Sequence, residues 1–182
     1  HFYIPLWREI FRKFGAIDGV QEYVREVMRQ GYSILVFPGG GREVLKRQGE
    51  QYQLIWKQRY GFLRLAQEFD YNIVPFAALG GDEIFEIGFD ARQVVENKYF
   101  QKLLKVSALN KLLRKGDVIP SLPKSLFPKR LPFYFQFQPA LSVSHIQSQE
   151  DMTLFRDQIQ QQIYQAIEEL KNIRASELSP KS

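Results

Sequence analysis

The spacing of apolar residues along the chain predicts an alternation of helices and strands. Apolar residues three or four positions apart indicate amphipathic helices, and this pattern covers residues 4–14, 18–30, 61–69 and 150–172. An unbroken apolar run over residues 33–37 is typical of a strand buried on both faces. A second apolar strand is predicted over residues 72–79, interrupted by Pro75. Because strand, loop, helix and strand follow one another, we expect parallel strands joined by a right-handed crossover.

The last third of the chain predicts one further strand and one long helix. Residues 133–138 alternate phenylalanine with polar residues, a period of two that indicates a half-buried strand. Residues 141–144 are expected to extend this strand after Pro139. The long helix is expected to bury a stripe of apolar side chains: Leu154, Phe155, Ile159, Ile163, Ile167 and Leu170. From Arg174 onward we expect the chain to fray.

These elements predict a single α/β domain over residues 1–174, followed by a flexible tail over residues 175–182. We expect a mixed, largely parallel central sheet flanked by helices, one or two of them over residues 91–115, with an amphipathic helix at the C-terminal end. In this arrangement the glycine-rich turns at residues 39–41 and 80–81 lie beyond the carboxyl ends of neighbouring strands. Proteins of the α/β class place their binding sites at such positions.

The turn after the first strand carries the most distinctive chemistry of the chain. Three glycines, an arginine and a glutamate follow one another: Gly39, Gly40, Gly41, Arg42 and Glu43. Glycines allow a backbone to pass close to a bound group and to direct its N–H donors at it, and arginine binds phosphate or carboxylate in a fixed geometry. We therefore favour a binding site over the alternative, a glycine-rich turn beside a solvated Arg–Glu pair.

The same stretch differs from the familiar phosphate and hydrolase loops. No Gly-Lys-Ser/Thr follows Gly41, and Val44 stands where the dinucleotide fingerprint requires a small residue. Ser33 falls within the predicted strand, and its surroundings lack the final glycine of a nucleophile elbow. These differences disfavour a nucleoside-triphosphate loop, a dinucleotide site and a serine hydrolase.

Composition narrows the chemistry further. The 182 residues contain no cysteine, which excludes disulfides, thiolate metal sites and a cysteine nucleophile. His1 and His145 are the two histidines that could act as bases. No uncharged apolar run approaches the ~20 residues that span a bilayer, so we expect any membrane contact by this chain at the surface. We expect no metal ion and no tightly bound cofactor.

The net charge of +5 is concentrated between Glu96 and Leu131, where nine Lys or Arg oppose two acidic residues. Large apolar residues are interleaved with these cations, which suits an anionic membrane surface, and Lys102, Lys105 and Arg114 are the candidate membrane-surface residues. The apolar residues are mostly leucines, which do not stack on bases, so nucleic acid is disfavoured. A solvated face on ordinary helices remains the alternative.

Residues 37–43 closely resemble the third motif of the glycerolipid and lysophospholipid acyltransferase superfamily, whose usual form is Phe-Pro-Glu-Gly-x-Arg. The Gly-Gly-x-x-Glu spacing from Gly39 to Glu43 is more similar to the branch that contains diacylglycerol acyltransferases and plant phytyl ester synthases. Further stretches resemble other parts of these proteins, in the family's order: residues 59–66, 73–76 and 131–135. The resemblance covers most of residues 4–144 and implies a glycerol-3-phosphate acyltransferase-like fold.

The catalytic motif of this superfamily, His-x-x-x-x-Asp, has no counterpart at the expected place. Leu6 is the fifth residue after His1, and His145, which Glu150 follows at that spacing, comes after the glycines and not before them. We interpret the match at His145 as a coincidence. We therefore expect the catalytic histidine and aspartate upstream of His1, and no catalytic residue within this chain.

The resemblance implies acyl transfer from a thioester, either acyl-CoA or an acylated carrier protein, to a lipid alcohol. It assigns substrate binding to Gly39, Gly40, Gly41, Arg42 and Glu43. Glu43 is expected to orient Arg42 or to accept a hydrogen bond from the acceptor alcohol. Phosphatidate-forming relatives carry glutamate at the position of Gly39. Its replacement by glycine is expected to open space and to favour a neutral, hydrophobic acceptor such as diacylglycerol or a long-chain alcohol.

Two alternatives remain open. A lysophospholipid (1-acylglycerol-3-phosphate) acyltransferase of the same fold would also retain Arg42. A catalytically inactive module that binds membrane surfaces would instead use the basic residues between 96 and 131. We expect the protein to associate with a membrane at its cytoplasmic face.

Overall fold

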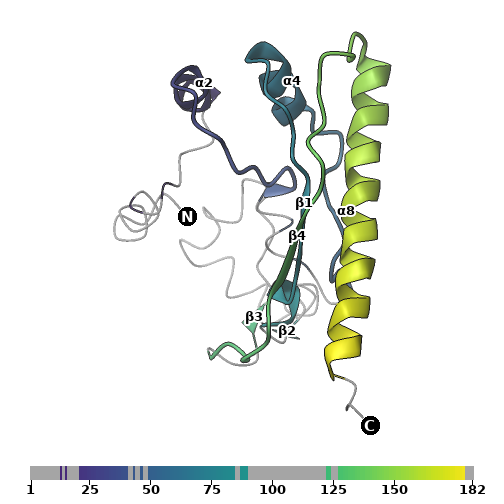
Figure 1. Ribbon diagram of the computed structural model, residues 1–182. Coiled ribbons are helices and arrows are strands. Elements are labelled where there is room, and N and C mark those ends of the chain that lie inside the picture. The colour runs from purple at the N-terminus through teal and green to yellow at the C-terminus, as the bar shows by residue number, and fades with distance from the viewer. Residues whose placement is uncertain are drawn as a thin grey trace, which may run out of the picture.

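The computed structural model describes residues 13, 15, 21–40, 43, 46, 49–84, 87–89, 122–123 and 127–178 (Figure 1). The elements of these residues in chain order are α2 (Gln21–Arg29), α4 (Gly61–Glu68), β1 (Phe76–Leu79), the short 3-10 helix η1 (Gly81–Glu83), β2 (Ile87–Phe89), β3 (Leu122–Pro123), β4 (Tyr134–Phe137) and α8 (Gln149–Leu178). The helices predicted over residues 91–115 lie outside these ranges, as does nearly all of the helix predicted over residues 4–14.

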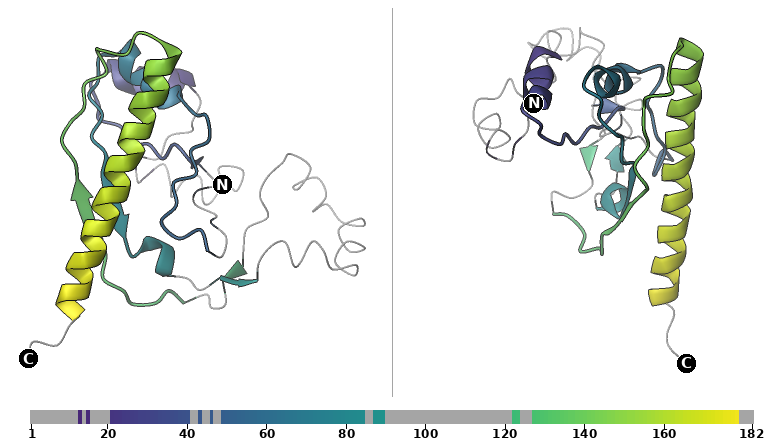
Figure 2. Two further views of the ribbon diagram at one scale, coloured as in Figure 1. Left: turned by 90° about the vertical axis from the view of Figure 1, so that its right-hand side faces the viewer. Right: turned by 45° about the horizontal axis from the view of Figure 1, so that its top comes forward.

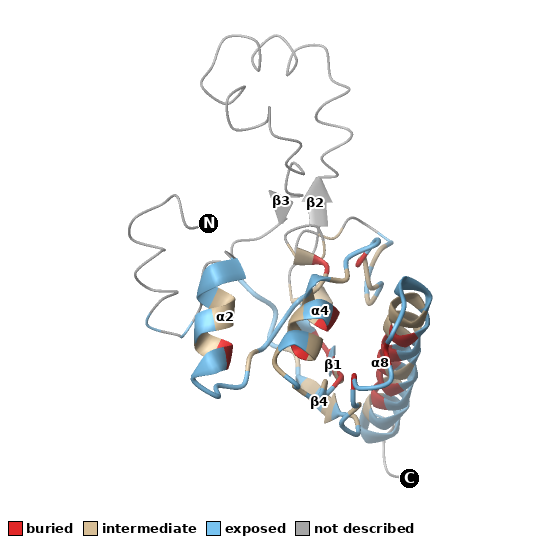
Figure 3. Cartoon of the chain, turned by 90° about the horizontal axis from the view of Figure 1, so that it is seen from above, coloured by how far each residue is buried: buried red, intermediate tan, exposed pale blue. Residues whose placement is uncertain are grey.

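Helices α2 and α4 form where the apolar spacing predicted them, and they lie side by side at one end of the molecule (Figures 1 and 3). Met28 is buried on α2, and Leu63 and Ala66 are buried on α4. The guanidinium of Arg25 on α2 binds the carboxylate of Glu68 on α4 at 2.8 Å. Helix α4 therefore buries two apolar residues and α2 buries one, and a partly exposed ion pair joins the two helices.

Strands β1 and β4 pair antiparallel, with Phe76 opposite Phe137. An isolated bridge between Ile73 and Leu141 continues the same pairing beyond the strand ends. Strands β2 and β3 form a second antiparallel pair. The strand predicted over residues 133–138 is thereby confirmed.

A largely parallel central sheet is not present among the described residues, because both of their sheets are two-stranded and antiparallel. The buried strand expected over residues 33–37 is also wrong. This segment has no strand pairing, and Leu35, Val36 and Phe37 are 64%, 46% and 59% exposed. An unbroken apolar run is typical of a strand covered on both faces by a sheet's neighbouring layers, but residues 33–37 belong to neither of the two sheets of the described residues.

Helix α8 runs along the β1–β4 sheet (Figure 2) and provides six of the thirteen described residues of the hydrophobic core. Its buried side chains are Phe155, Ile159, Ile163, Ala166, Ile167 and Leu170. Their partners in the core are Trp56, Leu63, Ala66, Ala77, Leu79, Val143 and Ile146. Figure 3 shows these buried positions gathered on α4, β1 and the inner side of α8. Leu154 was expected in this stripe but is 64% exposed, since it lies about 100° around the helix from Phe155.

Three hydrogen bonds between Asp151 and residues 147–148 cap the start of α8. The Oδ2 atom of Asp151 accepts the backbone N–H groups of Gln147 and Ser148 at 3.0 and 2.9 Å, and Ser148 Oγ accepts the N–H of Asp151 at 3.0 Å. These bonds, first the one from Gln147, hold the pKa of Asp151 below its ordinary value, as in a capping box. At its other end the helix continues to Leu178, so the expected tail over residues 175–182 is helical up to that residue. Within the described ranges, no helix combines the length and apolar character needed to cross a membrane.

Candidate substrate site at the glycine loop

The glycine loop, residues 37–43, turns sharply after Phe37. Gly40 donates its N–H to the carbonyl oxygen of Phe37 at 2.9 Å and has a φ of +54°, in the left-handed region that glycine favours. Gly39 is buried, but its φ lies outside that region. Gly41 and Arg42 lie outside the described residues, so their part in substrate binding stays a prediction.

Glu43 folds back against the start of the loop. Its carboxylate accepts the backbone N–H of Gly39 at 3.0 Å through Oε2 and the N–H of Ile55 at 3.4 Å through Oε1. A Cβ atom added to Gly39 would overlap the side chain of Glu43. The expectation that glycine at position 39 opens space is therefore wrong, because Glu43 fills that space. The carboxylate of Glu43 thus binds the backbone of its own loop and that of Ile55. Its expected part in orienting Arg42 or in binding the acceptor alcohol stays a prediction.

Arg59, to which the sequence assigned no role, holds the opposite side of the loop. Its Nη1 atom donates to the carbonyl oxygen of Pro38 at 2.9 Å. The same atom lies 2.9 Å from the place that a Cβ on Gly40 would occupy. A carboxylate on the N–H side and a guanidinium on the carbonyl side thus fix the turn over Pro38–Gly40. The signal in the sequence was the resemblance over residues 59–66, which begins with this arginine.

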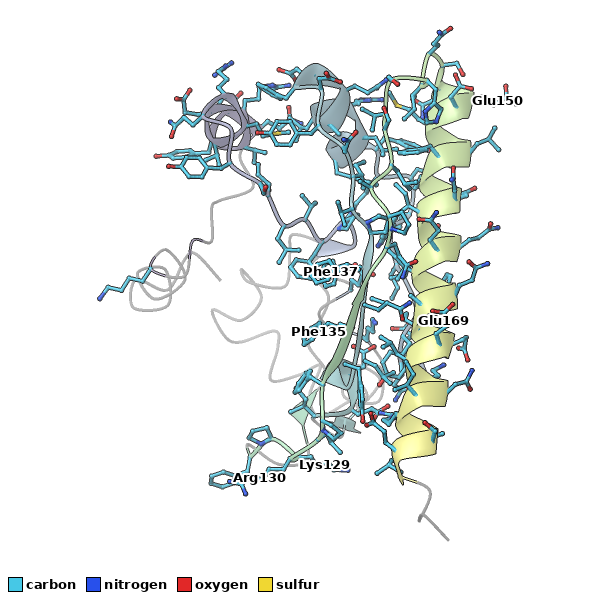
Figure 4. All side chains as sticks on the ribbon, viewed as in Figure 1. Lys129, Arg130, Phe135, Phe137, Glu150 and Glu169 are labelled. Carbon is cyan, nitrogen blue, oxygen red and sulfur yellow. The ribbon has the colours of Figure 1, made fainter. Side chains whose placement is uncertain are left out.

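An aromatic surface adjoins the loop on the side of the sheet that α8 leaves uncovered. We call it the aromatic face, and it consists of Phe37, Phe76, Phe133, Phe135 and Phe137. The ring centroids of Phe37 and Phe76 are 6.5 Å apart, and those of Phe76 and Phe137 are 5.7 Å apart. Phe133 and Phe135 stack at 6.2 Å. Phe135 and Phe137 are 59% and 72% exposed and point away from α8 (Figure 4).

The outward direction of these rings reverses the natural expectation from the sequence. The alternation over residues 133–138 predicted a half-buried strand, and apolar side chains ordinarily face the core. On β4, however, it is Tyr134 and Gln136 that turn toward α8. Their side chains donate hydrogen bonds to Glu177 and Glu169 on that helix, each at 2.6 Å. The phenylalanines therefore remain available to a partner other than α8.

The second glycine-rich turn lies beyond the end of β1, as predicted, and carries a charged junction. Arg174 on α8 donates to both oxygens of Glu83 at 2.8 and 3.1 Å, and the hydroxyl of Tyr52 also donates to Glu83. Neighbouring Asp82 accepts the N–H of Tyr52 and binds Lys46, each at 2.6 Å. We call these residues the Glu83 junction. It ties the end of β1 to α8 and to the segment that follows the glycine loop.

The junction shifts the pKa values of Glu83 and Tyr52 in opposite directions. The hydrogen bonds from Arg174 lower the pKa of Glu83, against the effect of burial. Burial, and then the bond to Glu83, raises the pKa of Tyr52 to about 12. The carboxylate therefore stays ionised and the phenol stays neutral at ordinary pH. Every group in the junction has a partner, which is typical of a structural tie.

Comparison with known proteins identifies the family. The family model described as diacylglycerol acyltransferase matches residues 1–175. The chain belongs to the diacylglycerol acyltransferase family. This match confirms the resemblance inferred from the glycine loop, and it includes both strands of the aromatic face and nearly all of α8.

Individual relatives agree with the family match. Over 184 aligned residues the chain is 28% identical to phytyl ester synthase 2, chloroplastic, of Arabidopsis thaliana, covering 93% of this chain and 26% of that protein. It is 34% identical to phytyl ester synthase 1, chloroplastic, of the same plant, covering 68% and 19%. Diacylglycerol O-acyltransferase 1 of Eremothecium gossypii is 31% identical over 47% of this chain and 19% of its own length. The chain thus spans about a quarter or less of these relatives. No solved structure matches it significantly.

His145 and Glu150 are the remaining residues of the sequence analysis that the structure describes. His145 lies in the turn before α8, with its ring edge-on to Phe155 at 5.1 Å, and Glu150 lies in the first turn of that helix (Figure 4). The interpretation of this match to the catalytic motif as a coincidence stays a prediction. The described ranges contain no group of three or more metal-ligating side chains. The other residues singled out lie outside those ranges: His1, Lys102, Lys105 and Arg114.

Proposed function

We propose that the protein that carries this chain is an O-acyltransferase that makes neutral lipid esters. It transfers a fatty acyl group from a thioester, acyl-CoA or an acylated carrier protein, to a hydrophobic alcohol such as diacylglycerol or a long-chain alcohol. The reaction needs no further cofactor. Its histidine and aspartate belong to the expected motif upstream of His1.

The observation that carries this proposal is the contact between the glycine loop and the aromatic face. Phe37 immediately precedes the turn and touches Phe76, from which the row of rings continues to Phe137. A hydrocarbon chain laid on these rings gains roughly 25 cal/mol for each Å² of apolar surface removed from water. The same placement brings the polar end of the lipid to the loop.

In the proposed reaction the upstream histidine transfers the proton, and the glycine loop stabilises the developing charge. The alcohol oxygen attacks the thioester carbonyl carbon, a C–O bond forms, the C–S bond breaks, and the alcohol proton passes through the upstream histidine to the departing thiolate. In this proposal Arg42 and the loop backbone stabilise the negative charge that develops on the carbonyl oxygen. Removing one such donor typically costs about 3 kcal/mol of transition-state stabilisation.

A neutral acceptor is supported by the aromatic face and by the names of the relatives. The relatives named above make phytyl esters or acylate diacylglycerol, by their printed names, and both acceptors are uncharged lipid alcohols. A membrane surface would supply such acceptors. We include the basic residues Lys102, Lys105 and Arg114 in the proposal as its contact with the cytoplasmic face of the membrane.

A comparison of acceptors tests the proposed function. The full-length protein is given one acyl-CoA together with diacylglycerol, a long-chain alcohol or lysophosphatidate, and the esters formed are quantified. We expect esters from the two neutral acceptors. Preference for lysophosphatidate would instead support the lysophospholipid acyltransferase, and vesicle binding with no transfer to any acceptor would support the inactive membrane module.

A variant of the aromatic face tests the observation itself. Phe137→Ala removes a ring that is 72% exposed, so we expect the KM for a long-chain alcohol to rise about fivefold, from roughly 1 kcal/mol of lost contact. A short-chain alcohol should show a smaller change. Tyr23→Ala is the matched control, because this ring is 64% exposed on α2. Equal KM values in both variants would contradict the role of the aromatic face.

A further inference from the structure

The side chain of Glu43 lies against Gly39, which comes four positions earlier in the glycine loop. Gly39 is buried and donates its N–H to Glu43 Oε2 at 3.0 Å. A Cβ on Gly39 would overlap the Cβ, the Cδ and the carboxylate oxygen of Glu43. The side chain of Glu43 therefore lies where a side chain of residue 39 would begin.

Backbone conformation does not account for glycine at position 39. The φ of Gly39 lies outside the left-handed region, so an L-residue could adopt this backbone. Its neighbour Gly40 differs, because a φ of +54° favours glycine there whatever lies around it. What opposes a side chain at position 39 in the structure is the overlap with Glu43.

The usual form of this motif, Phe-Pro-Glu-Gly-x-Arg, carries a carboxylate at the position of Gly39. We propose that Glu43 supplies that carboxylate from four residues later, so that Gly39 and Glu43 form one exchangeable unit that positions the glycine loop. This inference rests on the proposed function. Glu43 is a positioning residue in it, acting on substrate through the backbone that it holds.

The hydrogen bonds of Glu43 explain how the unit would position the loop. Its two oxygens join the N–H of Gly39 to that of Ile55, while Arg59 holds the carbonyl oxygen of Pro38 from the other side. Loss of the carboxylate frees one side of the turn and leaves the other attached. The loop backbone then shifts relative to the reacting group, and a misplacement of about 1 Å can cost roughly 100-fold in rate.

An exchange of the two residues tests the proposal in the full-length protein. Gly39→Glu alone overlaps Glu43, and Glu43→Gly alone removes the carboxylate, so we expect each to lower kcat about 100-fold with a nearly unchanged KM for the acyl donor. The double variant restores both a carboxylate and the space for it. We expect it to recover to within about tenfold of the wild type. Glycine is needed at position 43 because the Cβ of Glu43 takes part in the overlap.

Gly40→Ala is the matched control. It meets Arg59 and a left-handed backbone, so combining it with Glu43→Gly should restore nothing. Glu43→Gln keeps the shape of the side chain and one acceptor oxygen, and an intermediate loss of about tenfold is expected. A double Gly39→Glu, Glu43→Gly variant no more active than the weaker single variant, or a fully active Glu43→Gly variant, would overturn the proposal.

Amide hydrogen exchange separates this inference from the proposed function. In the same variants, the Ile55 amide should exchange faster after Glu43→Gly and regain protection in the double variant. This measurement requires no turnover. If the wild type transfers no acyl group, the proposed function fails, and the exchange of the Ile55 amide alone tests this inference. Protection of that amide regained in the double variant supports the exchangeable unit, and protection that stays lost rejects it.

Discussion

The two faces of the β1–β4 sheet are built from the same strands and differ in almost every other respect. On the face toward α8, Ala77 and Leu79 are 1% and 0% exposed and pack against residues such as Ile159. On the opposite face, Phe135 and Phe137 are 59% and 72% exposed. Stability therefore comes mainly from the first face. The second face is exposed among the described residues, and it adjoins the glycine loop.

The covered face is itself not uniform. Strand β1 presents small and branched apolar side chains to α8, whereas β4 presents Tyr134 and Gln136, which reach glutamates on that helix. Apolar burial thus fixes β1, whereas β4 is attached by hydrogen bonds to exposed carboxylates and by the packing of Tyr134 against the core. Because a net hydrogen bond contributes less than the burial of a leucine, β1 should dominate the attachment of the sheet to α8.

The largest expected effect compares one residue from each face. Leu79→Ala leaves a cavity in the core and should lower the free energy of unfolding by about 2–5 kcal/mol. Phe135→Ala removes a larger side chain from the exposed face and should change it by less than about 1 kcal/mol. Urea unfolding followed by fluorescence measures both. Similar losses in the two variants would mean that the aromatic face also belongs to the core.

The sequence predicted the elements of the covered face better than their surroundings. The helical spacing identified Phe155, Ile159 and Ile163 because a single helix face repeats with a fixed period. A period of two likewise identified β4, but alternation only sorts residues into two faces. Which face meets α8 depends on Tyr134 and Gln136 finding partners far along the chain, and no local pattern contains that information.

The candidate site shows the same limit. Three glycines beside an arginine marked the loop, since few other structures require such a run. The sequence did not predict the contacts that shape the loop. Glu43 folds back on Gly39, and Arg59 comes from a segment 21 residues beyond its partner Pro38. The run at residues 33–37 was misassigned for a related reason. Apolar character predicts that a segment will be covered, and it does not identify what covers it.

A smaller effect is expected at the Glu83 junction, which attaches the end of β1 to α8. Glu83→Gln removes the charge that Arg174 binds and should cost about 1 kcal/mol at pH 7, given the partial exposure of both side chains. The folded-state pKa of Glu83 lies below its ordinary value of 4.5. Its contribution is therefore present above pH 4.5 and is lost as the pH falls through the folded-state pKa.

Unfolding measured from pH 7 down to pH 3 checks this dependence. The wild type and Glu83→Gln should differ most at neutral pH and converge in acid. Glu168→Gln is the matched control, because Glu168 pairs with Lys171 within α8 and is 67% exposed, so little change is expected at any pH. A difference at Glu83 that grows in acid would reject the assigned sign.

The smallest effect belongs to the polar attachment of β4. The amide of Gln136 donates to Glu169 at 2.6 Å on the covered face, with Glu169 exposed at the surface of α8 (Figure 4). Gln136→Ala and Glu169→Ala should each cost about 0.5 kcal/mol, and a double-mutant cycle should give a coupling of similar size. A coupling above about 2 kcal/mol would place β4 on equal terms with β1. The two strands would then attach to α8 about equally strongly, although the difference in exposure between the covered face and the aromatic face would remain.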